Sequence, residues 1–580
     1  MANEHDPLDA LIVGAGFAGM YQLYRLREAG LSVRVIEAGT DVGGTWYWNR
    51  YPGARCDVPS MEYSFSFDQQ LEQDWTWSEV MSPQPEIFAY ARHVAERFEL
   101  RPYIQFETKV TAASFDDDRN QWRVTTDRGD RFDARFVIMA TGCLSVSNLP
   151  QIEGRESFAG LSLHTGNWPK TVGDDPCEML AGKRVGVIGT GSSGVQAIPV
   201  IAEAASHLHV FQRTPVYTFP ANNRPLRDDI VTSYKENYTE VRERQRHSVA
   251  GFSGFDPRRA NSNAHPKEGA VASGEGRAGD RAETRAEGRV AGRATTTSKQ
   301  RRPGLLDLSP AERTAAVDRY GPAVFMRYRD VYTDPEANEA ACDLYRDRID
   351  QVVTDPAVAE RLKPKDYPLG CKRQVYDTEY YETFNRDDVT LVDLSENPLR
   401  RITERGVDTA AESIELDVLV FATGFDAMTG ALNRIDIRGR NGRELRDDWA
   451  AGPQSYLGLS VAGFPNLFTI TGPGSPSVLS NVLVSIEQHV DWITACIAHL
   501  GDNGLSTIET TEEAQQDWAD QVAAAADGTM YTAPGCASWY LGANIEGKTQ
   551  VFMPYVGGVG RYRDICDQVA EDGYAGFVTA

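Results

Sequence analysis

Two glycine-rich turns, each standing between an apolar run and a helical stretch, constrain the fold of this 580-residue chain most strongly. The first turn, GAGFAG at 14–19, follows a short apolar run, and a second apolar run at 31–36 comes after the helical stretch. The second turn, GTGSSG at 189–194, stands in the same way between the apolar runs 184–188 and 208–211. A strand, a glycine turn, a helix and a second strand in this order form a unit that binds a dinucleotide. The sequence therefore predicts an α/β fold with two dinucleotide-binding units.

The first turn carries the residues that a pyrophosphate requires. Gly14 permits the tight turn, Gly16 lets the backbone approach the phosphates, and Gly19 permits close packing of the helix on the strand. The N-terminus of the helix then stabilises the phosphate charge. Glu37 ends the second apolar run and is placed to accept hydrogen bonds from a ribose without a 2′-phosphate, which predicts FAD or NAD here.

The residues that follow the second turn differ in charge from those that follow the first. Its second apolar run leads into Arg213 and Thr214, and no acid stands there. A guanidinium and a hydroxyl suit a 2′-phosphate, so this unit is predicted to bind NADPH in preference to NADH. Two such units in one chain imply hydride transfer from NADPH to a flavin. The predicted NADP-binding residues of the turn are Gly189, Thr190, Gly191, Ser192, Ser193 and Gly194.

The composition argues against several other classes of protein. The formal net charge of −24 disfavours a general nucleic-acid binder, which presents a basic face. No apolar run approaches the about 18–20 residues of a membrane span, and the N-terminus lacks the basic and apolar regions of a signal peptide. The eight cysteines are scattered without CxxC pairs, so neither a metal site nor a disulfide framework is expected, and a reducing cytoplasm is the predicted location.

Two near-repeats suggest how the domains are connected. VIMATG at 137–142 and VLVFATG at 418–424 each read as a buried strand that turns at Thr-Gly. Each follows one nucleotide unit, so the second unit is expected to be nested in the first. The expected parts are an FAD-binding domain (1–148 and 429–580), an NADP-binding domain (149–220 and 369–428) and a helical subdomain (221–368). Within the last, 258–303 has too few large aliphatic residues to form a core and is predicted to be a mobile surface insertion.

The stretch between the two units carries a more specific pattern. Phe158, Gly160, His164, Trp168 and Pro169 have the spacing FxGxxxHxxxWP. This resembles the fingerprint of type I Baeyer–Villiger monooxygenases. Taken alone, such a short stretch is more typical of an aromatic linker that covers a domain joint.

A second stretch strengthens the resemblance. Residues 43–57 match GGxWxxxxYPGxxxD, another signature of that family, at every fixed position. The resemblance runs from about residue 10 to the C-terminus, apart from 258–303, and is strongest to the phenylacetone monooxygenase branch. The chain departs from the family's late loop at Glu546, where proline is usual, which puts the conformation of that loop in doubt.

The resemblance implies an activity and its cofactors. Enzymes of this family use FAD, NADPH and O2 to convert a ketone into an ester or lactone through a C4a-peroxyflavin, and many also oxidise sulfides. They have two Rossmann-like domains, for FAD and NADP, the second nested in the first. A ketone and O2 are therefore the expected partners, and no obligatory protein partner is inferred.

The resemblance also implies roles for particular residues. Arg373 is the cation expected over the flavin, with Asp57 holding it, and Lys372 is expected to contact the NADP phosphate. Trp539 would lie on the NADP ribose and His164 would position NADP from the domain joint. Further FAD contacts are expected at Thr45, Trp46, Trp48, Tyr63, Val110, Cys143 and Val482. The substrate pocket is expected to include Cys56, Cys143, Leu144, Val478, Leu479 and Val482.

Two other functions fit part of the pattern. A flavin monooxygenase that oxidises only nitrogen or sulfur shares both glycine turns, but it usually varies the FxGxxxHxxxWP pattern and lacks the context of Lys372 and Arg373. A catalytically idle flavoprotein that docks a partner through 258–303 is the alternative from another class. The substrate, the regioselectivity and the oligomeric state are not determined by these motifs.

Overall fold

The computed structural model describes residues 7–170, 175–255, 304–320, 325, 328 and 330–580. The predicted insertion 258–303 lies outside the described residues. None of the helices within these ranges is long and apolar enough to cross a membrane.

The first sheet is built around the strand that enters the first glycine turn. β1 (Leu8–Val13) pairs in parallel with β2 on one side and with β6 on the other. Its central residues, 10–12, are fully buried, as expected for an apolar strand covered on both faces. The strand order is β17-β4-β5-β6-β1-β2-β3, and β18 also pairs with β6. The further bounds are β2 (Val33–Ile36), β3 (Ile104–Gln105), β4 (Val110–Asp116), β5 (Gln121–Thr126), β6 (Arg131–Met139), β17 (Asp436–Arg438) and β18 (Leu467–Thr469).

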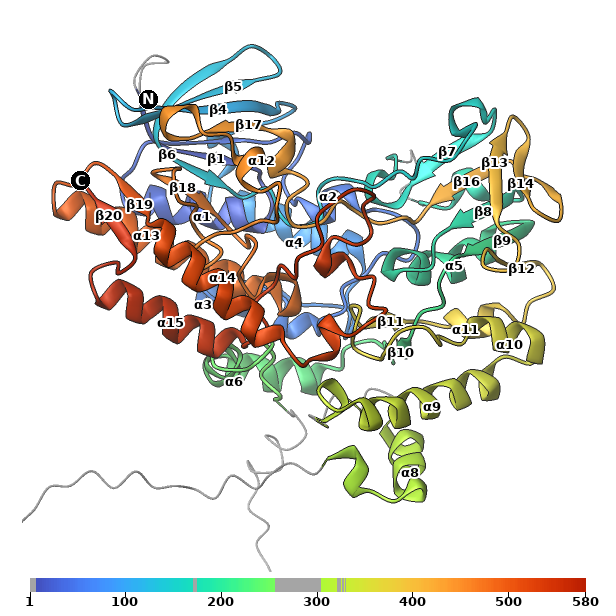
Figure 1. Cartoon of the computed structure of the whole chain (residues 1–580). Helices are drawn as coiled ribbons and strands as arrows, with labels where there is room; N and C mark the ends of the chain where they lie inside the picture. Colours follow the sequence, from blue (N-terminus) through green and yellow to red (C-terminus); the bar gives the residue numbers. More distant parts are fainter. Residues whose placement is uncertain (1–6, 171–174, 256–303, 321–324, 326–327, 329) are drawn as a thin grey trace, which may run out of the picture.

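The second sheet is smaller and entirely parallel. Its order is β12-β9-β8-β16-β7, and β8 (Arg184–Ile188) enters the second glycine turn. Figure 1 shows the two sheets on opposite sides of the molecule. The other bounds are β7 (Leu161–His164), β9 (His207–Gln212), β12 (Val389–Asp393) and β16 (Val418–Phe421).

The connectivity confirms the predicted fold class and the nesting of one unit in the other. β12 and β16 complete the second sheet, after which the chain returns and adds β17 and β18 to the first. The two near-repeats occupy equivalent places, because β6 lies beside β1 and β16 lies beside β8. In Figure 1 the C-terminal helices accordingly lie against the N-terminal sheet.

Helices cover both sheets and form the region between them. After the first turn α1 (Phe17–Glu28) packs on α13 (Val482–Asp502), and after the second turn α5 (Ser192–Ala204) packs on β8 and β9. Among the described residues, the other helices of four or more residues are α2 (Thr45–Trp48), α3 (Gln69–Asp74), α4 (Gln84–Arg97), α6 (Asp228–Arg246), α8 (Pro310–Tyr320), α9 (Pro335–Val352), α10 (Pro356–Leu362), α11 (Tyr380–Thr383), α12 (Leu445–Asp448), α14 (Glu512–Ala526) and α15 (Val559–Glu571).

The predicted helical subdomain (221–368) contains α8 and α9 as two separate helices. α9 begins afresh because Pro335 cannot donate a helical hydrogen bond and because the Asp334 carboxylate accepts from the backbone N–H groups of Glu336 and Ala337. Short strands form three further small sheets: β10 (Thr218–Pro220) with β11 (Val375–Asp377), β13 (Leu399–Thr403) with β14 (Gly406–Thr409) and β15 (Ser413–Glu415), and β19 (Ile508–Thr510) with β20 (Phe577–Thr579).

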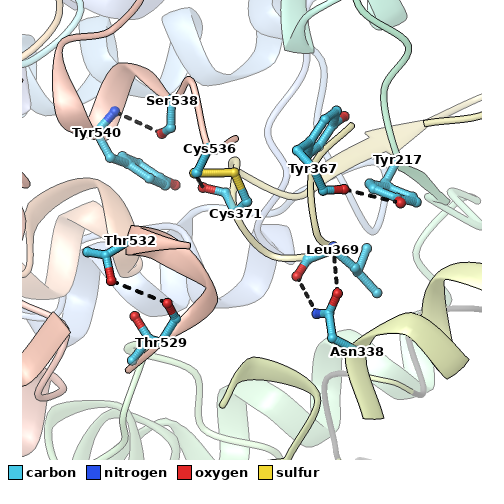
Figure 2. Close-up of a disulfide and its surroundings, with 10 residues drawn as sticks. All are labelled: Tyr217, Asn338, Tyr367, Leu369, Cys371, Thr529, Thr532, Cys536, Ser538 and Tyr540. Atoms are coloured by element: carbon cyan, nitrogen blue, oxygen red, sulfur yellow. Dashed lines mark hydrogen bonds between the residues drawn. A yellow bond between two sulfur atoms is a disulfide. The ribbon is translucent and has the colours of Figure 1, made fainter. Parts of the chain in front are cut away.

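One sequence-based expectation is wrong. Cys371 and Cys536 form a disulfide with a Cα–Cα distance of 5.7 Å, although no disulfide was expected from the cysteine spacing (Figure 2). The two residues are 165 positions apart and belong to segments that meet only in the folded chain. Local spacing therefore contains no signal for this pair.

Candidate active site

The first glycine turn has the geometry of a phosphate cradle. Gly14 adopts a φ of +105°, and a Cβ there would lie 2.6 Å from the Ala140 carbonyl oxygen. A Cβ on Gly19 would lie 1.8 Å from the Gly14 carbonyl oxygen, so the helix packs too closely for any side chain. A Cβ on Gly16 would meet nothing nearer than the Gly44 Cα atom at 3.4 Å. The backbone is therefore packed closely at Gly14 and Gly19, whereas Gly16 leaves room for a pyrophosphate at the start of α1.

Glu37 is fixed beside this turn. Its Oε2 atom accepts a hydrogen bond from the Ala15 amide at 2.6 Å, and Oε1 accepts one from the Gly39 amide at 2.6 Å. Burial raises the pKa of this carboxyl group, and the hydrogen bonds from the backbone amides act in the opposite direction. The two hydrogen bonds hold the carboxylate at the end of β2, where it could contact an adenosine ribose.

The other residues expected to contact FAD fall into separate groups. Trp46 and Tyr63 are buried together, and the Trp46 indole donates to the Tyr63 hydroxyl at 3.1 Å. Val482, at the start of α13, packs against that same core, whereas Val110 lies in a different core with residues of β1 and β2. Thr45 is exposed and Trp48 is half-buried, both in the short helix α2.

Cys143 belongs to another part of the site. Its thiol donates to the Thr471 carbonyl oxygen at 3.2 Å and lies 3.3 Å from the Ser477 hydroxyl. Burial raises the pKa of this thiol, so it remains protonated at neutral pH. The contact joins the end of the 137–142 near-repeat to the TGPGSPS segment at 471–477.

The second glycine turn repeats the geometry of the first. Gly189 has a φ of +110°, and a Cβ there would lie 2.5 Å from the Ala422 carbonyl oxygen. A Cβ on Gly194 would lie 2.3 Å from the Gly189 carbonyl oxygen, whereas one on Gly191 would meet no atom within 4 Å. The backbone at the start of α5 is thus packed closely at Gly189 and Gly194, and Gly191 again leaves room for a phosphate.

Side chains connect this turn to the residues that follow β9. The Thr190 hydroxyl donates to the Thr214 carbonyl oxygen at 3.1 Å, which fixes the segment containing Arg213 and Thr214 against the turn. Ser192 is exposed and Ser193 is half-buried in the first turn of α5.

Arg213 and Lys372 form a pair of neighbouring cations. Burial, and secondarily the charge of Arg213, lower the pKa of the Lys372 ammonium to about 8. The Lys372 Nζ atom lies 4.0 Å from the centroid of the Tyr367 ring. Among the described residues neither cation forms an ion pair with a carboxylate. Two such cations beside a dinucleotide turn suit an anion with two negative charges, such as a 2′-phosphate.

Arg373 is held on several sides. Its Nε and Nη2 atoms donate to the Asp57 Oδ2 atom at 3.0 and 2.6 Å, and Nη1 donates to the Val478 carbonyl oxygen at 2.6 Å. The Asp57 carboxylate is the largest cause that raises the pKa of Arg373, which therefore stays charged. The contact expected between these two residues is thus present. It brings the GGxWxxxxYPGxxxD segment to the Cys371–Arg373 segment, although Asp57 and Arg373 are 316 positions apart in the sequence.

His164 lies at the end of β7, where that strand meets the loop containing Trp168. Its Nδ1 atom accepts a hydrogen bond from the Gly166 amide at 2.9 Å, and Nε2 lies 3.4 Å from the Thr423 hydroxyl. Burial lowers the pKa of the imidazole, so the ring is neutral at pH 7. These contacts hold the second sheet's edge to the 418–424 near-repeat and favour a positioning role.

Trp539 is half-buried in a 3₁₀ turn that also carries Tyr540, and their ring centroids are 4.4 Å apart. Glu546, which replaces the usual proline, is exposed, so the substitution does not disturb packing. The loop is closed beyond it by an ion pair of 2.6 Å between the Lys548 Nζ atom and Asp426.

The expected pocket residues divide between two clusters. Leu144, Val478 and Leu479 pack together with Cys143 near Arg373, whereas Cys56 and Val482 belong to the core of the first unit. The sequence analysis missed Met428 and Tyr540, which belong to the same cluster as Val478. Tyr540 could have been found from the sequence because it is adjacent to Trp539, whereas Met428 reaches this cluster only through the tertiary structure.

Comparisons with known proteins agree with this arrangement. A family model described as pyridine nucleotide-disulphide oxidoreductase matches residues 11–250. The chain is 39% identical to a Baeyer-Villiger monooxygenase of Pseudooceanicola batsensis, over 98% of this chain and 96% of that protein. It is 38% identical to an acetone monooxygenase (methyl acetate-forming) of Gordonia sp., over 98% of each chain. It is also 38% identical to a phenazine N-monooxygenase of Lysobacter antibioticus, over 99% of this chain and 98% of that one.

Solved structures give the same picture. An oxidized steroid monooxygenase bound to NADP has a TM-score of 0.85 and 45% identity, and the alignment covers 99% of each chain. A protein called OTEMO, in complex with FAD and NADP, has a TM-score of 0.87 and 38% identity, again over 99% of each chain. The narrower assignment to the phenylacetone monooxygenase branch stays a prediction. Full-length identity near 38%, together with the two dinucleotide turns, shows that this chain belongs to the flavin-dependent Baeyer–Villiger monooxygenase family.

Proposed function

We propose that this protein uses FAD, NADPH and O2 to insert one oxygen atom next to a ketone carbonyl, giving an ester or lactone. The observation that carries the proposal is the Arg373–Asp57 pair, in which two hydrogen bonds to one carboxylate oxygen hold the guanidinium. The acetone monooxygenase among the relatives is named for an ester product, which supports the same reaction type here.

The residues present fit both cofactors. FAD is proposed to lie on the turn of Gly14, Gly16 and Gly19, with its ribose at Glu37. The reason is that Gly16 has no side chain to obstruct the phosphates. NADPH is proposed to lie on the turn of Gly189 and its neighbours, with its 2′-phosphate between Arg213 and Lys372. The division into FAD-binding, NADP-binding and helical parts with the boundaries predicted above belongs to this proposal.

Arg373 is the proposed catalytic cation. Bound FAD would supply the redox chemistry, and the route through a C4a-peroxyflavin is part of the proposal. A guanidinium remains charged throughout the physiological range, so it stabilises developing negative charge on oxygen without donating a proton. Asp57 is proposed to orient that guanidinium, because both of its hydrogen bonds end on one carboxylate oxygen.

The remaining assigned residues are proposed to bind NADPH or to hold the joint between the two units. Lys372 and Arg213 attract the phosphate, Trp539 covers the NADP ribose, and His164 holds the joint between the two units. The apolar cluster that contains Leu144, Val478 and Met428 is proposed to receive the ketone next to Arg373. Oxidation of sulfides is proposed as a side activity. A ketone and O2 are the proposed partners, with no obligatory protein partner.

A second candidate function is oxidation of an aromatic ring nitrogen. The phenazine N-monooxygenase matches this chain with the same identity as the acetone monooxygenase, so overall similarity does not separate the two reactions. The purified enzyme, loaded with FAD, distinguishes them in one assay. Oxygen uptake and gas chromatography of products are measured with NADPH and a panel of linear, cyclic, aryl and steroid ketones, a sulfide and an aromatic N-heterocycle. Esters or lactones support the first proposal, whereas N-oxides without any ester overturn it.

A further inference from the structure

Tyr540 belongs to the same apolar cluster as Val478, whose carbonyl oxygen accepts a hydrogen bond from Arg373 at 2.6 Å. Its ring is only 2% exposed, and its hydroxyl lies next to the Arg373 guanidinium. Burial raises the pKa of this hydroxyl, so it stays protonated and neutral beside the cation. With Asp57 and the Val478 carbonyl oxygen, Tyr540 places a third oxygen at the guanidinium.

The disulfide lies immediately beside this contact. Cys371 stands two residues before Arg373, and Cys536 stands four residues before Tyr540. The disulfide and the contact between Arg373 and Tyr540 therefore close one ring, made of the segments 371–373 and 536–540. Both half-cystines are buried, Cys371 at 0% exposure and Cys536 at 7%. Figure 2 shows the disulfide with Tyr540 and Ser538 next to it.

Each side of this ring is also fixed to the rest of the fold. On one side Asn338 of α9 donates from Nδ2 to the Leu369 carbonyl oxygen at 2.8 Å and accepts from the Leu369 amide at 3.2 Å. On the other side the Tyr540 carbonyl oxygen accepts from the Met553 amide at 3.0 Å. The two segments meet closely, since a Cβ on Gly535 would lie 2.6 Å from the Asp366 carbonyl oxygen.

We propose that Tyr540, held by the Cys371–Cys536 disulfide, is a positioning residue for the Arg373 guanidinium. The disulfide keeps the Lys372–Arg373 segment and the Trp539–Tyr540 turn at a constant separation, and the tyrosine hydroxyl then fixes the direction of the cation. Because Trp539 and Tyr540 are adjacent, the same turn links the proposed NADP contact to the proposed catalytic group. The inference rests on the proposed function, since it concerns the cation of that reaction.

A merely structural role and a positioning role predict different results for Tyr540→Phe. This variant keeps the buried ring and removes only the hydroxyl. We expect the ester formed per NADPH consumed to fall about tenfold, the usual effect of losing a hydrogen bond to a charged group. Anaerobic reduction of the bound flavin by NADPH should stay within about twofold of wild type, because that half-reaction does not need the oriented cation. Tyr531→Phe, which removes the hydroxyl of a ring that lies next to Tyr540, is the matched control.

The disulfide is tested by measurements that do not depend on activity. The unfolded wild-type protein should react with six equivalents of a thiol reagent before reduction and eight after it. Reduction by a phosphine breaks the S–S bond with two electrons, gives two thiols and oxidises the phosphine to its oxide. In the Cys371→Ala/Cys536→Ala double variant, amide hydrogen exchange should become faster in peptides covering 368–374 and 533–541. Cys177→Ala is the control, since its thiol is free and lies elsewhere.

Each outcome decides the proposal. A lower ester yield with unchanged flavin reduction in Tyr540→Phe, six initial thiols and faster exchange in the double variant support it. Wild-type ester yield in Tyr540→Phe, eight initial thiols, or unchanged exchange in both peptides overturns it. If the double variant does not fold, the tyrosine variant and the thiol count still decide. Absence of ester from the wild type is a distinct result that overturns the proposed function and, with it, this inference.

Discussion

Arg373 donates two hydrogen bonds to a single oxygen of Asp57, from Nε at 3.0 Å and from Nη2 at 2.6 Å. The side chains are 31% and 25% exposed, so the pair is partly open to its surroundings. The guanidinium is therefore fixed in direction while one side of its charge remains available. The first two predictions follow from this geometry.

Arg373→Ala is expected to separate the two half-reactions. Flavin reduction by NADPH should continue, whereas ester formation should fall by at least about a hundredfold, because the charge that stabilises the oxyanion is gone. Stopped-flow absorbance and product chromatography measure the two steps. Arg373→Lys is the control, since it keeps a charge but loses the paired donors. Normal ester yield from the alanine variant would contradict the assignment.

Asp57→Asn is expected to give a smaller loss of the same kind. The amide keeps the size of the side chain but removes the negative charge that is the main cause of the raised pKa of Arg373. We expect ester per NADPH to fall by about ten- to a hundredfold, because a charge-assisted pair becomes an ordinary hydrogen bond. The yield with a ketone that the wild type converts is the measurement. Equal yields in variant and wild type would show that Asp57 does not orient the cation.

The affinity for NADPH is expected to depend on pH through Lys372. Because burial and the charge of Arg213 lower the pKa of this ammonium to about 8, it is charged below that pH and neutral above it. The KM for NADPH should be flat below about pH 8 and rise by up to tenfold per pH unit above it.

NADH provides the internal control for this prediction. It lacks the 2′-phosphate, so its KM should not show the same rise. The pH-dependent difference between the two cofactors should disappear in Lys372→Met, which has no titrating group. Parallel curves for NADPH and NADH in the wild type would place the 2′-phosphate away from Lys372.

Arg213→Ala is expected to narrow the preference for NADPH over NADH. Loss of one charged hydrogen bond to phosphate should raise the KM for NADPH by about tenfold and leave that for NADH nearly unchanged. Steady-state kinetics with both cofactors measure the ratio. An unchanged ratio would assign the discrimination to other residues.

Arg242→Met is expected to destabilise the fold away from the candidate site. Arg242 is buried with 6% side-chain exposure, and its Nε atom donates to Glu72 at 2.7 Å while Nη2 donates to Ser64 at 2.7 Å. Removing the cation leaves Glu72 buried and unpaired, which costs about 3–5 kcal/mol. Arg244→Ala breaks the exposed pair with Glu240 and should cost less than about 1 kcal/mol. Urea denaturation compares the two, and equal losses would contradict the prediction.

Much of the fold could be predicted from local patterns in the sequence. The turns at 14–19 and 189–194 and the apolar runs around them predicted both parallel sheets, because a strand covered on both faces must be apolar throughout and a tight turn must be glycine. The near-repeats at 137–142 and 418–424 predicted the nesting. Within the predicted helical subdomain α9 begins separately from α8, because the Asp334 carboxylate caps its N-terminus and Pro335 cannot continue a preceding helix.

The sequence by itself determined the two dinucleotide units, their order and the residue types that suit two different riboses, since these depend on neighbours within a single strand–turn–helix unit. Only the tertiary structure decided which distant groups meet. Asp57 and Arg373 are 316 positions apart, and Cys371 and Cys536 are 165 apart. Such contacts form where separate domains return to one another, and their geometry depends on the packing of the whole chain. Local spacing carries no record of that packing. The contact between Asp57 and Arg373 was expected only through the family resemblance, and the place of Tyr540 beside Arg373 could be read only from the folded protein.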